Sequence, residues 1–324
     1  MPATDHRLVV DIAAWWITAV YECGGTVQPV LFDGRARAPS GVFHHSGDYT
    51  AGAGALAEGL AHPESYRPDP MTLLRHGGPA AAIAAVLSHV AEHTGRPSAL
   101  TVVTAQTWDP PARDRLEQAA SLAGMPHPAV VTTAAAAASL TGAAIVLVCV
   151  AGSAWPELTL VDTRDGHRHL ATAAVRAGGA PAIDEALMRV AAARAGADAD
   201  PDDWRVSREI DRARAALVVQ PRAAMLLPEP HQAVVVTRDD LAAATAVHLD
   251  RLADTVKQLL ADAEIDPGSV GAAVLVGENA QVGAALTDAG LPPAVTVRNP
   301  HALVRGAVTS RPPGRFPWLP WRRR

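Results

Sequence analysis

Aromatic side chains and cysteines are scarce in this sequence, and their scarcity limits how the chain can be stabilised. Aromatic residues make up 4% of the 324 residues, and Cys23 and Cys149 are the two cysteines. Both lie in apolar runs typical of strands, so buried thiols are the simpler interpretation and a disulfide is the alternative. Packing must therefore rest on valine, leucine and many alanines rather than on rings.

The sequence also lacks an excess of charge of one sign and a long apolar run. The net charge is -5, which gives no broad basic surface for nucleic acid. No stretch reaches the ~20 apolar residues that span a bilayer, and the N-terminus has no signal-peptide pattern. With 49% apolar residues, the composition predicts a globular protein in the cytoplasm, either one large two-lobed unit or two domains.

Strand and helix patterns alternate after an opening hairpin. Residues 8–23 are strongly apolar, and Gly24-Gly25 separates them from residues 26–32, which predicts a hairpin. The turn-rich segments 35–40 and 44–54 are predicted to be loops. Strands are expected over 99–107, 129–131, 144–150, 158–162, 167–175, 233–236 and 272–276, and helices over 80–93, 110–124, 133–140, 181–195, 203–218, 237–263, 279–289 and 300–308.

The pattern restarts near residue 142. Each half begins with strands and continues into strand and helix alternation, which indicates an internal duplication. We expect one lobe over residues 1–141, a second over 142–309, and a flexible or membrane-proximal tail over 310–324. Two α/β lobes of this kind are expected to enclose a cleft, which is where ligands bind in such architectures.

Short segments spread over residues 7–309 follow the order of one known family. They are 9–12 (VVDI), 38–42 (APSGV), 102–124, 130–139, Gly178-Gly179 with Asp184, 211–217 (DRARAAL), 274–285 (VLVGENAQVGAA) and 299–307. In this order they resemble the nucleotide-binding domain of Hsp70 chaperones, a member of the actin/Hsp70/sugar-kinase superfamily. The resemblance implies an α/β actin/Hsp70-type ATPase fold, in which two RNase H-like lobes surround a central cleft.

The resemblance also implies residues that would bind a nucleotide in this cleft. They are Asp11, Gly178, Gly179, Asp184, Asp211, Arg214 and Gly277. Asp11 would be a remnant metal-site carboxylate, the glycine pair would offer amides to an anion, and Arg214 would lie near the base. The plainer alternatives are a strand-end carboxylate without a ligand, a simple turn, and a solvated or salt-bridged arginine.

The two phosphate loops depart from the family. Its first loop has Gly-Thr-Thr after the aspartate, where this chain has Ala13-Ala14-Trp15-Trp16. Its second loop, Asp-Leu-Gly-Gly-Gly-Thr, is matched by residues 149–155, CVAGSAW, with one glycine and no carboxylate. Strand alternation would send the two tryptophans to opposite faces, so at least one should lie in the core. The family's Glu becomes Thr132, and Arg75 is the nearest candidate for its catalytic Lys.

These departures disfavour hydrolysis, because a phosphate cradle and a positioned metal supply most of the catalysis in phosphoryl transfer. We expect no catalytic residue, no metal and no resident cofactor, with weak ATP or ADP binding as the alternative. The sequence also leaves no room for a peptide-binding domain. It therefore predicts a catalytically degenerate Hsp70-like protein that acts as a protein-binding scaffold. The alternative is a slow Mg-dependent ATPase or nucleotide sensor that uses Asp11, Gly178 and Gly179.

Composition and the C-terminal tail suggest a setting. The alanine-rich composition and basic tail resemble actinobacterial proteins, among which divergent Hsp70-like proteins are associated with type VII secretion. This resemblance implies a partner from a secretion apparatus at the inner face of the membrane. The tail, RPPGRFPWLPWRRR, suits a membrane interface through Trp318, Trp321, Arg322, Arg323 and Arg324, which would make the chain a membrane-associated adaptor. The alternatives are the flank of a removed transmembrane segment, a disordered tail, or one that docks its tryptophans on the body.

Overall fold

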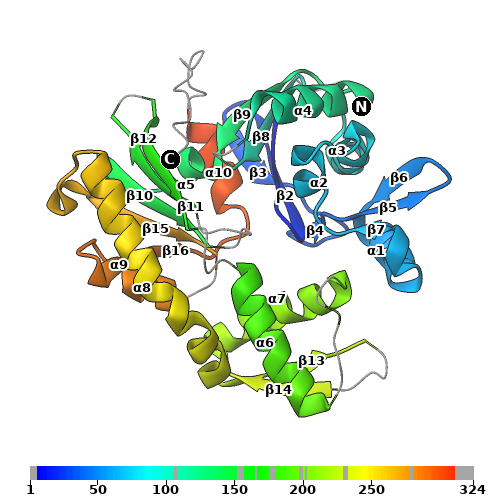
Figure 1. The fold of residues 1–324 in the computed structure, drawn as a ribbon. Coiled ribbons are helices and arrows are strands. Elements are labelled where there is room, and N and C mark those ends of the chain that lie inside the picture. Colours follow the sequence, from blue (N-terminus) through cyan, green and yellow to red (C-terminus); the bar gives the residue numbers. More distant parts are fainter. Residues whose placement is uncertain are drawn as a thin grey trace.

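The computed structural model describes residues 6–105, 108–151, 157–164, 166–175, 180–196, 200, 203–228, 233–277 and 280–310. Within these ranges the chain forms two large mixed sheets, two small sheets and the helices that cover them (Figure 1). The expected α/β class is therefore confirmed.

The first large sheet is built from strands that lie between residues 7 and 132. Its strand order is β3-β2-β1-β8-β9, and β4 also pairs with β2. The first three strands form an antiparallel meander, whereas β8 and β9 run parallel to β1. The strands are β1 (Arg7–Ile12), β2 (Trp16–Cys23), β3 (Thr26–Pro29), β4 (Ala38–Pro39), β8 (Ala99–Thr104) and β9 (Pro128–Thr132). The predicted turn at Gly24-Gly25 joins β2 to β3, with positive φ at both glycines.

The second large sheet repeats this arrangement. Its order is β12-β11-β10-β15-β16, with an antiparallel meander of three strands followed by two strands parallel to β10. Its strands are β10 (Ile145–Val150), β11 (Glu157–Asp162), β12 (Arg168–Ala174), β15 (Ala272–Val276) and β16 (Val295–Val297). The chain thus builds the same five-strand pattern twice.

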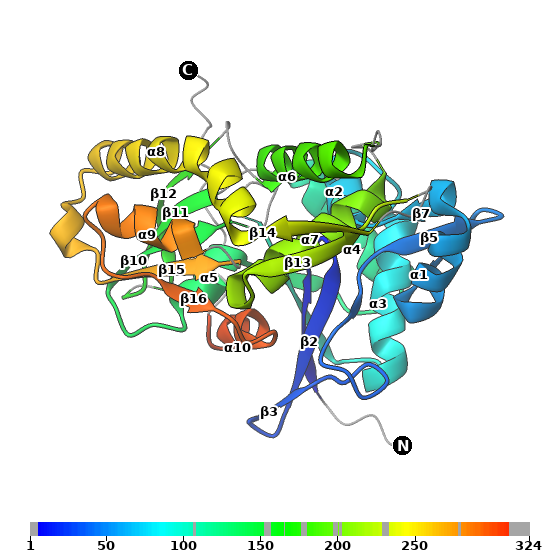
Figure 2. The same cartoon turned by 90° about the horizontal axis from the view of Figure 1, so that it is seen from below.

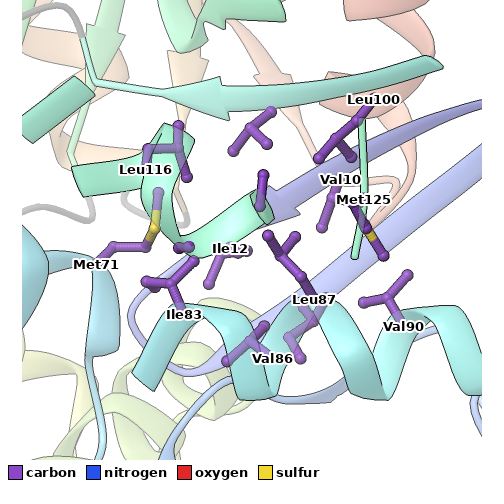
Figure 3. Close-up of a cluster of buried hydrophobic side chains, with 14 of the residues drawn as sticks. Val10, Ile12, Met71, Ile83, Val86, Leu87, Val90, Leu100, Leu116 and Met125 are labelled. Carbon is purple, nitrogen blue, oxygen red and sulfur yellow. The ribbon is translucent and has the colours of Figure 1, made fainter. Parts of the chain in front are cut away.

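Helices cover the outer face of each large sheet. The first sheet carries α2 (Pro70–Arg75), α3 (Ala80–Thr94) and α4 (Pro110–Leu122), and the second carries α8 (Arg238–Asp262) and α9 (Ala280–Asp288). Alternate residues of β1, such as Val10 and Ile12, pack against Ile83, Leu87 and Leu116 (Figure 3). This arrangement follows from the period of two along a strand.

Helix starts follow the local sequence signals. The Asp109 side chain accepts from the Ala112 amide, and proline occupies the first turn of α4. The predicted N-terminus of α8 is confirmed as a capping box between Thr237 and Asp240. No helix of the described ranges combines the length and hydropathy needed to cross a bilayer.

Two short helices, α5 (Thr133–Ala138) and α10 (Ala302–Thr309), lie between the two large sheets. Ala135 and Ala136 pack with the first sheet, whereas Ala134, Ala137 and Ala138 pack with the second. The run of five alanines that follows Thr133 in α5 is thereby explained, because a helix enclosed on opposite sides has room only for methyl groups.

Each half carries an insertion between its meander and its parallel strands. The first insertion contains β5 (Val42–His45), β6 (Asp48–Ala51), α1 (Gly52–Ala61), a 3-10 turn η1 (Pro63–Ser65) and β7 (Tyr66–Arg67). The second contains α6 (Ala180–Ala195), α7 (Trp204–Val219), β13 (Arg222–Leu226) and β14 (Ala233–Thr237), and a further turn, η2 (Pro267–Ser269), follows α8.

The loop predicted over residues 44–54 is wrong. A hairpin of β5 and β6 and the start of α1 occupy this segment, with positive φ at Ser46, Gly47 and Gly52. Turn residues dominate its composition, but β5 pairs with β6 along one edge and with β7 along the other. Strand pairing therefore overrides the local turn signal.

Candidate functional site

A cavity of about 370 Å³ lies between the two halves of the molecule. Asp11, Ala151, Gly277 and Arg298 contribute to its wall, and each lies at or just beyond the carboxyl end of β1, β10, β15 or β16. Ligands in open α/β sheets bind beyond the carboxyl ends of parallel strands. The volume is at the lower end of the range for small-molecule sites.

Asp11 is the acidic group at the end of the central strand of the first sheet. Burial raises the pKa of its carboxyl group to about 7. It stands opposite Thr18 on β2, whose hydroxyl is buried. Among the described residues neither side chain has a hydrogen-bond or ion-pair partner. The pair thus offers a carboxyl group, close to half-ionised at neutral pH, and a free hydroxyl to a ligand.

The turn from β1 to β2 is closed by its own hydrogen bonds. The Ala13 amide donates to the Trp16 carbonyl at 2.9 Å. The buried Ser40 binds the other side of the turn: its amide donates to the Trp15 carbonyl at 3.2 Å and its hydroxyl donates to the Ala14 carbonyl at 3.0 Å. The Ala13 amide, which an anion cradle would need, therefore already has a partner inside the protein.

Both tryptophans of this turn line the cavity. Trp15 is partly buried against Phe43 and its neighbours, whereas Trp16 is 38% exposed and lies beneath the Arg37 guanidinium, 5.5 Å from its ring centroid. The prediction that at least one would lie in the core is therefore wrong. Trp15 precedes the first residue of β2, so strand alternation does not apply to it.

An ionic group forms the wall on the side of the second insertion. Arg214 on α7 lies 3.1 Å from Asp184 on α6 and donates to Asp211 at 3.1 Å. Its Nε and the Asp184 Oδ1 approach without hydrogen-bond geometry, so this contact is ionic. Burial raises the pKa of Asp184 to about 6, with Arg214 opposing the shift and Asp211 adding to it. Arg214 is thus both salt-bridged and part of the cavity wall.

The structure brings together four of the residues named from the sequence, since Asp11, Asp211, Arg214 and Gly277 all line the cavity. Asp184 contacts the site through Arg214. Gly178 and Gly179 lie outside the described residues, as do residues 152–156 of the second loop and the tail with Trp318, Trp321 and Arg322 to Arg324. Arg75 lies on α2, where its carbonyl accepts from Arg115.

Sequence reasoning missed several lining residues. Arg37 and Arg298 are exposed at the cavity and have no acidic partner among the described residues. His248 on α8 also lines the cavity, and its buried Nδ1 has no hydrogen-bond partner among the described residues. Burial lowers the pKa of its ring, and the nearby Arg251 charge lowers it further. The helical spacing of Thr245, His248 and Leu252 on one face of α8 was the available signal for His248.

The wall combines apolar and cationic groups. Arg37, Arg214 and Arg298 supply positive charge, and the apolar part is formed by Trp15, Trp16, Ile183, Leu241, Leu249 and Leu252. A small ligand with a flat apolar part and an anionic group matches this wall. A metal-bound polyphosphate fits it poorly, because Asp11 stands beside two indoles and a turn that is closed by its own hydrogen bonds. Within the described ranges no group of three His, Cys, Asp or Glu side chains is arranged to hold a metal ion.

No protein-family model matches the chain, and no curated protein sequence matches it significantly.

Proposed function

We propose that the chain adopts the actin/Hsp70-type ATPase fold and acts as a catalytically degenerate, protein-binding scaffold. Three observations support the fold. The two large sheets share one strand order, a helix from each half packs between them, and a cavity lies where the carboxyl ends of their parallel strands meet. Such a repeat is the arrangement expected of two RNase H-like lobes around a cleft.

The turn between β1 and β2 is the observation that carries the loss of catalysis. A phosphate cradle needs small residues with free amides, yet this turn brings two indoles to the cavity and uses the Ala13 amide internally. Asp11 keeps the position of a metal-site carboxylate but stands in surroundings that favour its neutral form. Both features oppose the binding of a Mg-polyphosphate.

An exposed apolar face on the second insertion supports a protein partner. On β13 and β14, Ala224 pairs with Val235 and Leu226 with Ala233, and all four point away from the core. Leu226 is 52% and Val235 50% exposed. Clustered apolar groups on a surface mark interaction sites. A component of a secretion apparatus at the inner face of the membrane is the partner that the family resemblance suggests.

Phosphate release from Mg-ATP tests the loss of catalysis. We expect the wild type and Asp11→Asn to release phosphate at the same background rate. Turnover that depends on magnesium and disappears in Asp11→Asn would contradict the proposal. Asp250→Asn, an exposed carboxylate on α8, is the matched control, because it changes the same group outside the cavity.

Charge insertion tests the scaffold. Leu226→Asp and Val235→Asp should each abolish co-purification of the partner from the source cells, and the same loss should appear when the two purified proteins are mixed. Leu122→Asp, on an exposed position of α4, is the control and should retain the partner. A partner that binds all three variants equally would contradict the assignment of this face.

A nucleotide sensor is the second candidate, favoured by the cavity that remains open beside the tryptophans. Arg37 and Arg298, which have no acidic partner among the described residues, would face the anionic group of the ligand. Equilibrium titration with Mg-ADP decides between the two functions. A sensor requires saturable binding that is weakened in Arg298→Ala, whereas the scaffold requires none.

A further inference from the structure

Three exposed arginines lie together at the rim of the cavity. Arg37, just before β4, and Arg298, just after β16, both line the cavity. Arg305 lies on α10, and Figure 2 shows this helix beside β2. Within the described ranges none of the three arginines has an acidic partner. We call Arg37, Arg298 and Arg305 the cationic rim.

A buried histidine joins the members of the cationic rim. His301, the residue before α10, is 8% exposed. Burial and the Arg305 charge lower the pKa of its ring, hydrogen bonds to the backbone of segment 30–36 raise it, and the Arg37 charge lowers it again. Two rim cations thus act on one ring, and Arg298 lies three residues before it. Because the His301 ring favours its neutral form, the positive charge here comes from the arginines.

The acidic side chains of this region do not neutralise the cationic rim. Asp33, on the turn after β3, lies 3.7 Å from the Nε2 of His93 on α3. Asp211 in the cavity wall accepts a hydrogen bond from Arg214 at 3.1 Å. Burial raises the pKa of Asp11 to about 7, which reduces its charge. The rim therefore carries uncompensated positive charge, although the net charge of the chain is -5.

Trp16 adds an apolar surface to the cationic rim. Its ring is 38% exposed, lies 5.5 Å beneath the Arg37 guanidinium and lines the same cavity. Tryptophan and arginine are enriched among the residues that contribute most to protein interfaces, and guanidinium groups bind carboxylates with paired hydrogen bonds. We propose that the cationic rim and Trp16 bind an extended acidic segment of a protein partner, with its carboxylates on the arginines and an apolar side chain against the indole.

The concave position of the cationic rim selects a peptide among possible polyanions. Arg37, Arg298 and Trp16 line a cavity, which an extended chain can enter and a flat lipid surface contacts poorly. A nucleic acid needs a broad basic surface, and a net charge of -5 gives none. The assignment rests on the proposed scaffold function and deepens it, because it names the charge of the partner segment. It uses other residues than the apolar face of β13 and β14.

Fluorescence anisotropy with acidic peptides and the full chain tests the cationic rim. The first probe is a fluorescein-labelled oligoglutamate with one leucine at its centre, and the second is the same peptide without the leucine. Arg37→Glu, Arg298→Glu and Arg305→Glu reverse the charge of the rim. Arg96→Glu is the matched control, because Arg96 is exposed between α3 and β8 and does not line the cavity.

We expect Arg37→Glu and Arg298→Glu each to weaken binding of the leucine probe by about tenfold or more, and Arg96→Glu to stay within about twofold of the wild type. Trp16→Ala should lower the affinity for the leucine probe to that for the pure oligoglutamate. Equal binding by the wild type and the double variant of Arg37→Glu with Arg298→Glu would overturn the proposal, as would an equal loss in Arg96→Glu. If Arg37→Glu does not fold, Arg37→Gln decides by the same comparison.

Two further arms identify other anions. Phosphatidylserine vesicles that bind the wild type but not the rim variants, without any peptide binding, would assign the cationic rim to a membrane and overturn the proposal. Inorganic phosphate that saturates the same arginines as effectively as the peptide would make it a small-anion site, with the same consequence. Co-purification with Leu226→Asp tests the scaffold separately. A partner that is lost in that variant, while the wild type ignores both peptides, contradicts the rim alone.

Discussion

The two halves of this protein meet at a base, formed by α5 and α10, and at a second contact between the two insertions, which we call the mouth. The two contacts are built from opposite kinds of residue. At the base, α5 supplies alanines and α10 supplies Gly306, which lies so close that a Cβ there would overlap the Ala136 carbonyl oxygen. At the mouth, the Trp204 ring packs against Tyr66 with the centroids 4.5 Å apart, and its indole N–H donates to the Pro63 carbonyl at 3.1 Å. The scarce aromatic residues of the chain are thus used where the two insertions touch.

This difference indicates that the two contacts contribute differently to the stability of the protein. Backbone-to-backbone approach at the base is reinforced by Ser139 and Ser310, whose hydroxyls donate to the Gly306 and Ala135 carbonyls. Such close packing has no room for substitution and no alternative arrangement. The mouth is a contact between side chains of the two insertions, Trp204 from one and Tyr66 from the other, and it involves neither large sheet. We therefore expect the base to contribute more to global stability than the mouth does.

The largest effect is expected at the base. Gly306→Ala should lower the free energy of unfolding by about 3 kcal/mol, because the new methyl group meets backbone atoms of α5 that cannot move aside. Urea denaturation measures it. Gly283→Ala on α9 is the control, since its methyl group would sit at an ordinary 3.7 Å from Ala294. It should stabilise the protein by up to about 1 kcal/mol through helix propensity. A Gly306→Ala variant that is as stable as the wild type would contradict the contrast between the base and the mouth.

The next largest effect on the free energy of unfolding is expected at Asp11. Because burial raises its pKa from 3.8 to about 7, the native state binds a proton that the unfolded state has lost, and wild-type stability falls as the pH rises from about 4 to about 7. Asp11→Asn removes this penalty. It should equal the wild type below about pH 4 and be about 2 kcal/mol more stable at pH 8, a value reduced for partial exposure. Melting curves across this pH range measure the difference, and a variant whose advantage does not change with pH would contradict the prediction.

A smaller effect on global stability is expected at the mouth. Trp204→Ala should cost about 1–2 kcal/mol in urea denaturation, less than the about 3–5 kcal/mol usual for truncating a buried tryptophan. The cost is limited because Trp204 packs where the two insertions touch and lies outside both large sheets. A loss of about 4 kcal/mol would show that the mouth contributes to global stability as much as the base does, and the contrast between them would disappear.

The smallest effect is expected where Arg37 covers Trp16. Arg37→Ala should cost about 0.5 kcal/mol, since the cation–π contact is partly exposed to water. Its fluorescence signature should be clearer than its effect on stability, because Trp16 becomes more accessible to acrylamide. Unchanged quenching would show that the stacking does not persist in solution.

Much of the fold could be predicted from local signals. Periodicity and caps placed β15 and the start of α8 correctly, because those signals lie within a few residues of each other. The short strands β13 and β16 and the hairpin of the first insertion could not be placed, since they are held by pairing with a neighbouring strand and their own composition does not signal a strand. The sequence predicted that both halves begin with a meander of strands, but it did not predict which residues pair across neighbouring strands.

The site was predictable only in part. Asp11, Asp211, Arg214 and Gly277 were named through a family pattern that follows the chain, and the structure places them at one cavity. Arg37 and His248 belong to no such pattern and reach the cavity only because of how the sheets and α8 pack. The packing of Tyr66 is still less visible in the sequence. A Cβ at Gly41 or at Gly59 would overlap the Tyr66 side chain, and only the folded structure shows that these glycines leave room for it.

The melting temperature with and without millimolar Mg-ATP or Mg-ADP, followed by intrinsic tryptophan fluorescence, tests the central claim most directly. A ligand that binds only the native state stabilises it by about 2.7 kcal/mol at one hundred times its dissociation constant. We expect neither nucleotide to raise the melting temperature, as a degenerate scaffold requires. A magnesium-dependent rise that is lost in Arg298→Ala would contradict that claim and make the cavity a working nucleotide site.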